Sequence, residues 1–313
     1  MSLLQSAPRF IESLDPQGLI RQMFPEYSNI HRFQTDYESL IKSASASAAR
    51  VPQIIHQIWM GSPLPSDLER LSRTWRALHP EWEYRLWTDA EIKGFEFSTR
   101  DLFESTTCYG QRSDILRAEI LARYGGVYVD LDYFCHQCID ELVSGFDFFA
   151  SLRHVMAAHL GWREVWREPV VVCNSIIGAK AGHPILKKYL DLVRLTWSKR
   201  DQFKVNEGEL HPIALYLMGG KSRADHVKQT GLSTYLTFHK TVTEAMNSSG
   251  TRDLALPPSF FNPIIQDWRL IYLMPEFWQA WKTSGAPWPK LWHYSGVRKH
   301  TFADHQSKAR WAI

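Results

Sequence analysis

The chain has 313 residues, enough for one large α/β domain with additions or for two domains, and enough to bury a core without disulfides or metal ions. Apolar residues make up 44% and charged residues 22%, which excludes disordered, collagen-like and coiled-coil proteins. The formal charge of +3 is too small an excess of basic residues to predict nucleic acid as a partner.

Several features of the sequence bear on cellular location. No apolar run reaches the roughly 18 residues that a membrane span needs. The start of the chain lacks the pattern of a secretory signal. The four cysteines do not form a disulfide framework, which favours a reducing compartment. These features predict a cytoplasmic protein with no transmembrane segment.

The N-terminal part of the chain predicts a helical appendage. Residues 10–42 have the apolar spacing of short amphipathic helices that are interrupted by prolines. Residues 43–49 are alanine and serine, which is typical of a linker. We therefore expect a helical segment over residues 1–50 and a separate domain over residues 51–313.

The predicted domain alternates strands and helices. Residues 51–59 are rich in β-branched side chains and predict a strand, and residues 66–78 follow with the apolar spacing of a helix. Residues 83–87 predict the next strand, and this strand–helix–strand order is typical of a parallel sheet. Further along, residues 170–178 predict a strand and residues 183–196 a helix.

The most informative segment predicts a helix, a sharp turn and a strand. Apolar spacing gives a helix with Ser113 as its N-cap, and Gly125-Gly126 ends it. The alternation that follows gives a strand whose polar face carries Asp130 and Asp132. Residues two apart on a strand have their Cα atoms roughly 6–7 Å apart. The sequence therefore places two carboxylates side by side at the end of a strand.

Two neighbouring carboxylates repel each other unless a positive group lies between them. A divalent cation satisfies this condition, and oxygen ligands favour Mg²⁺ or Mn²⁺. Ligands of α/β sheets bind at the carboxyl ends of the strands, where this pair falls. Asp114 and Arg117, spaced i and i+3 on the preceding helix, are expected to face the same pocket. The alternative is a pair of solvated acids after a strand.

This segment resembles the DXD glycosyltransferases, the family of the yeast α-1,6-mannosyltransferases and, more distantly, of the clostridial large glucosylating toxins. The resemblance is carried by the pattern Ser-Asp-x-Leu-Arg over residues 113–117 and by Tyr-Gly-Gly-Val-Tyr-x-Asp-x-Asp over residues 124–132. Residues 54–61 and 82–87 match the opening of the family. The resemblance implies a GT-A fold, in which a Rossmann-like sheet binds a nucleotide sugar through a metal ion.

The resemblance also implies roles for individual residues. Asp132 ligates the metal ion, and Asp130 contacts the ribose or a metal-bound water. Trp59 stacks on the nucleobase, which an indole face suits. The other residues implied in donor binding are Ile58, Tyr128, Asp114, Arg117 and Asn174, of which Asp114 and Arg117 hold the donor sugar and its phosphate. The alternative for Asn174 is a strand-end residue that caps a turn.

Two adjacent acids leave a metal ion incompletely coordinated, so a later ligand is expected. The segment 293–299 resembles the His-x-x-Gly-x-x-Lys motif of glycogenin-like retaining glycosyltransferases. This resemblance implies that His293 ligates the metal and that Lys299 meets the diphosphate, with Ser295 and Gly296 lining it. The residues after Lys299 depart from that motif. The alternative is a loop histidine with no metal.

The predicted function is a metal-dependent, retaining transfer of a hexose or N-acetylhexosamine from a nucleotide sugar, a UDP-sugar being favoured, to a glycan or protein. The cofactor is Mn²⁺ or Mg²⁺. One alternative is a non-catalytic sugar-binding protein on the same fold. Another is a phosphatase with an aspartate nucleophile, although residue 134 is Phe where that class carries a small residue. The protein could also be a secreted effector that is delivered to a host cell. Residues 1–50 could contact a membrane surface.

Overall fold

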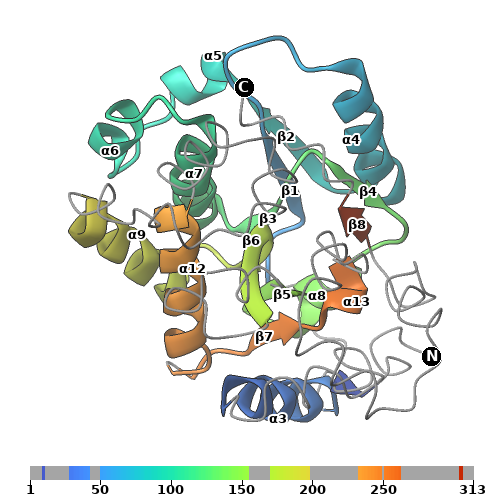
Figure 1. Ribbon diagram of the computed structural model, residues 1–313. Coiled ribbons are helices and arrows are strands. Elements are labelled where there is room, and N and C mark those ends of the chain that lie inside the picture. The colour runs from blue at the N-terminus through green and yellow to red at the C-terminus, as the bar shows by residue number, and fades with distance from the viewer. Residues whose placement is uncertain are drawn as a thin grey trace, which may run out of the picture.

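Strands from both halves of the chain form one mixed sheet, in the order β2-β1-β3-β6-β5-β7 (Figure 1). The computed structural model describes residues 9–10, 28–42, 50–154, 170–197, 232–248, 250–261 and 303–305. The strands of the sheet are β1 (Ile54–Ile58), β2 (Glu83–Trp87), β3 (Gly126–Val129), β5 (Phe148–His154), β6 (Val170–Ala179) and β7 (Asp253–Leu256). A separate antiparallel pair consists of β4 (Tyr133–Cys135) and β8 (Ala303–His305). This architecture confirms the predicted α/β class.

The direction of β6 distinguishes this sheet from a fully parallel one. β1 pairs in parallel with β2 and β3, and β5 pairs in parallel with β7. β6 is antiparallel to both of its neighbours, β3 and β5. The parallel arrangement predicted for the first strands is therefore confirmed, whereas the sheet as a whole is mixed.

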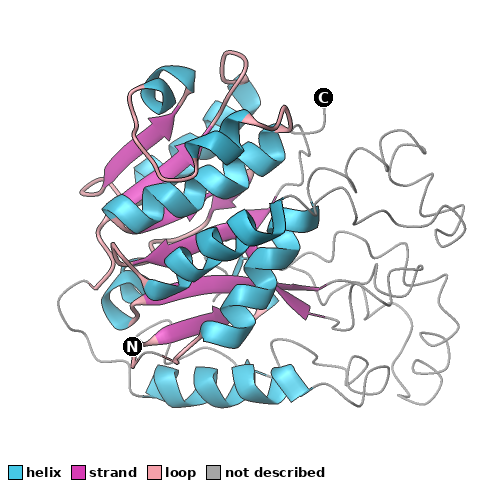
Figure 2. Cartoon of the chain, turned by 90° about the vertical axis from the view of Figure 1, so that its left-hand side faces the viewer, coloured by secondary structure: helices cyan, strands magenta, loops and turns pink. Residues whose placement is uncertain are grey.

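Helices cover both faces of the sheet. The described helices are α3 (Ser28–Lys42), α4 (Ser66–Leu78), α5 (Asp89–Lys93), α6 (Arg100–Glu104), α7 (Tyr109–Tyr124), α8 (Asp140–Gly145), α9 (Pro184–Thr196), α12 (Leu232–Ala245) and α13 (Pro258–Phe261). Helices α7, α9 and α12 lie on one side of the strands, with α4 on the other (Figure 1). Turned by 90°, helices α7, α9 and α12 lie in front of the strands (Figure 2). Within these described ranges, every helix is too short or too polar to cross a bilayer.

The N-terminal helix α3 packs on the edge of the sheet. Phe33 and Tyr37 on α3 are 2% and 3% exposed and belong to the main core, as does Phe10. The Arg252 guanidinium donates to the carbonyl of Leu40 at 3.4 Å, which joins α3 to the start of β7. The division of the chain at residue 50 and a membrane contact through residues 1–50 stay predictions.

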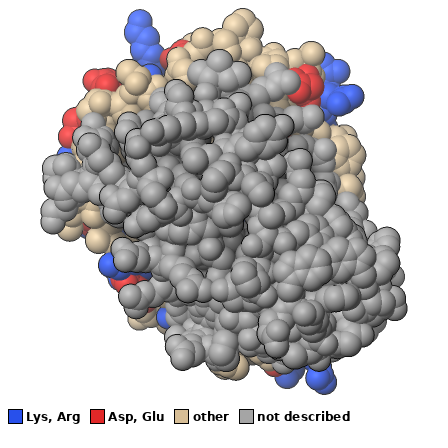
Figure 3. Space-filling view, viewed as in Figure 1, with Lys and Arg blue, Asp and Glu red and all other residues tan. Residues whose placement is uncertain are grey.

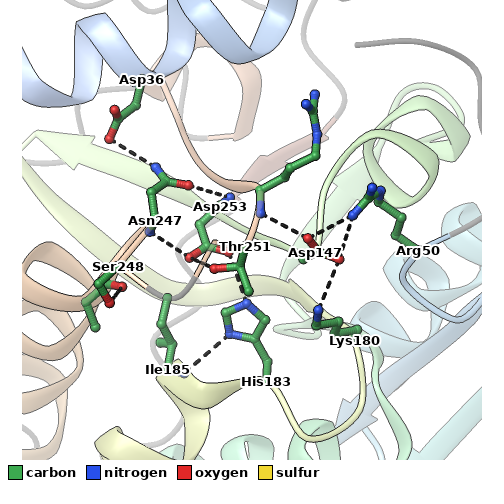
Figure 4. Close-up of polar contacts among 12 residues, drawn as sticks. Asp36, Arg50, Asp147, Lys180, His183, Ile185, Asn247, Ser248, Thr251 and Asp253 are labelled. Atoms are coloured by element: carbon green, nitrogen blue, oxygen red, sulfur yellow. Dashed lines mark hydrogen bonds and ion pairs between the residues drawn. The ribbon is translucent and has the colours of Figure 1, made fainter. Parts of the chain in front are cut away.

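A polar cluster lies where β5 and β7 begin and β6 ends (Figure 4). The buried Asp253 carboxylate accepts bonds from the Asn247 amide, the Thr251 hydroxyl and the His183 ring at 2.8–3.0 Å. Asn247 in turn donates to Asp36 of α3 at 3.1 Å. The cluster therefore ties the N-terminal helix to the end of the sheet at which β5 and β7 begin.

Described charged side chains of both signs are interspersed along the outline of the face seen in Figure 3. Two of the exposed ion pairs are of the i and i+4 type, Arg73 with Glu69 on α4 and Lys187 with Asp191 on α9. Such exposed pairs contribute only a few tenths of a kcal/mol each. Most of the stability therefore comes from the apolar core between the sheet and the helices.

The glycine pair after α7 has the conformation that its sequence predicts. Gly125 and Gly126 have φ angles of +65° and +97°, so α7 ends there and the chain turns directly into β3. A side chain on Gly126 would place its Cβ atom 2.7 Å from the Ile54 carbonyl oxygen of β1. The turn thus needs both the φ freedom and the small size of glycine.

Replacing Gly126 with alanine is expected to lower the free energy of unfolding by at least about 2 kcal/mol, because of the positive φ and the close approach of β1. Urea unfolding measures the loss. Gly145→Ala is the matched control, because a Cβ atom at that helical position meets nothing within 4 Å. Equal stability of the two variants would contradict this account of the turn.

Candidate functional site

Several of the predicted site residues that the structure describes gather where β3 ends, between α7, β6 and α12. β6 is irregular there, because Ala150 of β5 pairs with Ile177 whereas Leu152 pairs with Val172. Two steps along β5 thus correspond to five along β6. The extra residues form a bulge over 173–176, a feature that is over-represented beside active sites. The bulge carries Asn174 toward α7.

Arg117 is the centre of this cluster. It lies on α7 and is 5% exposed. Its Nη1 donates to the backbone carbonyl of Asn174 at 2.6 Å and lies 3.5 Å from Asp130 Oδ1. Its Nη2 donates to Ser113 Oγ at 2.9 Å and lies 3.0 Å from Asp114 Oδ1. One planar guanidinium therefore orients groups from α7, from β6 and from the end of β3.

Asp114 is a buried carboxylate, 8% exposed, with partners from three elements. Arg117 comes from the same helix. Asn174 Nδ2 of β6 donates to Asp114 Oδ1 at 2.8 Å, and the Thr234 hydroxyl of α12 donates to Oδ2 at 2.6 Å. Burial raises the pKa of Asp114, and Arg117, Thr234 and Asn174 oppose that rise. Asp114 and Arg117 are thus in direct contact, while their facing one pocket stays a prediction.

Asp130 lies just beyond β3, close to Tyr128. The fully buried Tyr128 hydroxyl donates to Asp130 Oδ1 at 2.6 Å, and the Arg117 guanidinium lies over the Tyr128 ring at 4.5 Å. The strand ends at Val129, so Asp130 and Asp132 stand in a turn rather than on a continued strand. The extension of the strand through both acids is therefore wrong, and the pair is positioned by tertiary contacts instead.

Ser175 of the β6 bulge holds the turn that carries the two acids. Its carbonyl accepts the Asp130 amide at 2.8 Å, and its hydroxyl bonds the Tyr133 hydroxyl at 2.7 Å. The Tyr133 amide donates to the Asp130 carbonyl at 3.3 Å. Asp132, between these two anchors, is 8% exposed. Ser175 and Tyr133 are thus supporting residues that the sequence did not reveal.

Trp59 lies next to the same turn, just after β1. It is 8% exposed and forms a small cluster with Leu131, the residue between the two acids, together with Leu68 and Leu71 of α4. Its indole nitrogen donates to the Pro63 carbonyl at 3.2 Å. Ile58, 1% exposed, precedes it at the end of β1. The structure thus brings Trp59 to the Asp pair, while its stacking on a nucleobase stays a prediction.

The Asp pair suits a divalent cation by its chemistry, because two carboxylates supply only hard oxygen ligands. Among the described residues, no group of three or more His, Cys, Asp or Glu is arranged to hold a metal. Two acids alone fit a cation that completes its coordination with phosphate oxygens and water, as Mg²⁺ does in many nucleotide sites. Asp130 and Asp132 therefore fit such an ion as partial ligands.

Four predicted site residues lie outside the described residues: His293, Ser295, Gly296 and Lys299. Their predicted contacts with the metal and the diphosphate stay predictions.

One histidine and two cysteines of the described chain have shifted pKa values. Burial lowers the pKa of His56 to about 4, and its ring bonds the Trp87 indole at 3.1 Å and the Gly125 carbonyl at 3.0 Å. Burial raises the pKa of Cys135 to about 12 and that of Cys138 to about 11, which keeps both thiols protonated.

One expectation about the cluster needs correction, and one of its residues was missed. Helix α7 begins at Tyr109 with Cys108 at its N-cap position, not at Ser113. Ser113 is fully buried one turn inside the helix, where its hydroxyl accepts from Arg117 instead of capping backbone amides. Thr234 was not predicted at all, and no local pattern marks it, because it lies 120 residues from Asp114.

The comparisons with known proteins agree with this geometry. Residues 65–149, which include α7, β3 and both acids, match the family model of the glycosyltransferase sugar-binding region containing a DXD motif. The chain is 32% identical over 148 residues to inositol phosphoceramide mannosyltransferase 3 of Schizosaccharomyces pombe, which covers 45% of this chain and 37% of that protein. It is 31% identical to mannosyl phosphorylinositol ceramide synthase SUR1 of Saccharomyces cerevisiae, over 49% of this chain and 37% of that protein.

These relatives overturn the predicted cytoplasmic location. Their names describe the mannosylation of inositol phosphoceramide, and a ceramide lipid resides in a membrane. The prediction depended on the lack of an apolar span, the lack of a secretory pattern and the cysteine content. None of these features identifies the compartment in which a protein acts. The matched segment spans 37% of the length of each of these relatives.

Solved structures with a similar arrangement include glycosyltransferases. The PaToxG glycosyltransferase aligns with a TM-score of 0.44 at 17% identity, over 87% of this chain and 90% of that chain. The UDP-bound glycosyltransferase domain of the YGT toxin aligns with a TM-score of 0.41 at 10% identity, over 66% and 80%. The predicted resemblance is confirmed by the family match itself, because residues 65–149 match the model of the glycosyltransferase sugar-binding region containing a DXD motif.

Proposed function

We propose that the protein is a metal-dependent glycosyltransferase that takes its sugar from a nucleotide sugar, with a UDP-sugar favoured. The observation that carries the proposal is the connected set of Asp114, Arg117, Asn174 and the half-buried Asp130 at the end of β3, inside and beside the matched region. Ligands of α/β sheets bind at this end of the strands. Polar groups held this rigidly are suited to orient a substrate.

In this proposal, different residues bind different parts of the donor. Asp114 and Asn174 face the sugar. The Asp114 carboxylate accepts hydrogen bonds from the sugar hydroxyls, and the Asn174 amide accepts from them or donates to them. Arg117 lies beside both Asp114 and Asp130 and offsets their negative charge next to an anionic donor. Asp130 and Asp132 would hold Mn²⁺ or Mg²⁺. Such a cation stabilises the charge that develops on the diphosphate as the bond to the sugar breaks.

We further propose that the anomeric configuration is retained. Asp114 and Asp130 lie 3.0 and 3.5 Å from the Arg117 guanidinium, so both carboxylates are already engaged by a cation of the protein. A diphosphate oxygen of the donor is then the base that takes the proton of the acceptor hydroxyl. NMR of the product anomer tests this step, and an inverted product would reject it.

The acceptor is a hydroxyl of a glycan or a protein, or of the inositol headgroup of a lipid, as the names of the yeast relatives suggest. A hexose and an N-acetylhexosamine both stay open as the transferred sugar. The mannosyltransferase relatives add GDP-mannose to the donors that should be tested.

The purified chain is expected to hydrolyse one nucleotide sugar slowly when Mn²⁺ is present, because donor activation does not require the acceptor. The measurement is a screen of UDP-glucose, UDP-galactose, UDP-N-acetylglucosamine and GDP-mannose for nucleoside diphosphate release, with and without EDTA. Turnover of one donor that EDTA stops would support the proposal. Binding of a donor without hydrolysis or transfer would favour the non-catalytic alternative, and phosphate release from p-nitrophenyl phosphate the phosphatase.

A further inference from the structure

Helix α12 contributes to the site although it lies outside the matched family region, which ends at residue 149. We propose that Thr234 of α12 is a positioning residue of the donor site, which holds the Asp114 carboxylate in the orientation that meets the donor sugar. The inference rests on the proposed function, and it assigns a role to a residue far from the DXD motif.

The contact geometry limits how the Asp114 carboxylate can turn. Oδ1 is held by Asn174 at 2.8 Å and by Arg117 at 3.0 Å, both on one side of the group. Oδ2 receives the Thr234 hydroxyl at 2.6 Å. With both oxygens held, rotation about the bond to the carboxyl carbon is restricted. Each oxygen has about two lone-pair sites, so the carboxylate can still accept a hydroxyl of a sugar.

Thr234 itself is held by an element that is anchored independently of Asp114. The Val172 amide, next to the β6 bulge, donates to His239 Nδ1 of α12 at 3.0 Å. Burial lowers the pKa of His239 to about 4, so the ring is neutral at neutral pH, and its Nδ1 accepts the Val172 N–H. Phe238 packs edge-on against Tyr189 of α9 with ring centroids 5.4 Å apart. The hydroxyl of Thr234, 1% exposed, therefore stands at a fixed place.

A purely structural threonine would affect stability and leave ligand binding unchanged. A positioning residue on the sugar side of the site would instead affect the binding of only one of two ligands. Its removal weakens the binding of a nucleotide sugar, whose sugar meets Asp114, and leaves the binding of the free nucleoside diphosphate unchanged. This difference separates the two roles without a measurement of turnover.

The test compares Thr234→Val with Thr234→Ser and with Thr241→Val. Valine keeps the shape but loses the hydroxyl, whereas serine keeps the hydroxyl. Thr241 is the matched control: it is a buried threonine of the same helix whose hydroxyl donates to the Thr237 carbonyl, 2.7 Å away, and not to the site. Calorimetry with Mn²⁺ measures the affinity of each variant for the nucleotide sugar that the wild type binds and for its nucleoside diphosphate.

Thr234→Val is expected to lose on the order of tenfold or more in affinity for the nucleotide sugar, because a hydrogen bond to a charged group is removed. Its affinity for the nucleoside diphosphate should match that of Thr241→Val, and Thr234→Ser should restore the wild-type values. Equal affinities of Thr234→Val and Thr241→Val, or equal losses for both ligands, would overturn the inference while the proposed function stands. A wild type that binds none of the nucleotide sugars would overturn both.

If Thr234→Val does not fold, Thr234→Ala takes its place with the same expected results, because alanine also lacks the hydroxyl and introduces no larger group.

Discussion

Arg117→Met is expected to lower the free energy of unfolding by about 3–5 kcal/mol and to abolish turnover of the donor. The loss follows from the burial of Asp114, which would keep its negative charge without a cation beside it. The carbonyl of Asn174 would also lose its donor. Because the site and the fold share this one guanidinium, stability and activity should fall together.

Urea unfolding and the donor-hydrolysis rate measure the two effects of Arg117→Met. Arg123→Met is the control, because Arg123 is exposed at the end of the same helix and such substitutions change stability by about 0.5 kcal/mol or less. The double variant Arg117→Met, Asp114→Asn should recover part of the lost stability, since it also removes the buried negative charge. A single variant as stable as Arg123→Met would contradict the central role of Arg117.

Arg117→Lys is not expected to rescue the protein. The planar fork of arginine bonds Ser113 and Asn174 and lies beside Asp114 and Asp130 at once, whereas a lysine ammonium is a single point charge. This difference explains why an arginine and no other cation stands at the position.

The local elements were predictable because their signals are local. The apolar spacing of 66–78 and the β-branched composition of 51–59 predicted the observed helix α4 and strand β1. Gly125 and Gly126 predicted the turn, because only glycine adopts their φ angles at no cost. Asp114 and Arg117 were found because they are neighbours on one helix face and match a family motif.

The contacts that assemble the site were not predictable, because they join residues far apart in the sequence. The direction of β6 depends on which strands it meets, and its bulge over 173–176 arises from its pairing with β5. The Ser113 position fits an N-cap by its residue type, but the helix extends by one more turn because tertiary burial outweighs that preference. The Thr234 contact depends entirely on the packing of α12.

Asp132→Asn should separate catalysis from stability. Donor turnover is expected to fall on the order of 10³-fold, as when one electrostatic partner of a reacting group is removed. The free energy of unfolding should change by less than about 1 kcal/mol, because asparagine has the same shape. Asp130→Asn should lose both donor turnover and stability, since the Tyr128 hydroxyl and Arg117 hold that carboxylate in the fold.

The measurements for Asp132→Asn are donor hydrolysis and the binding of Mn²⁺ by electron paramagnetic resonance, which does not require turnover. Asp191→Asn, an exposed acid on α9, is the control and should match the wild type in both. Turnover within threefold of the wild type, together with unchanged Mn²⁺ binding, would show that the cation is held elsewhere. Loss of turnover and of Mn²⁺ binding in Asp132→Asn, without loss of stability, would instead mean that the turn held by Ser175 and Tyr133 presents this carboxylate to the ion. The bulge of β6, which carries Ser175, would then contribute to catalysis by positioning that turn.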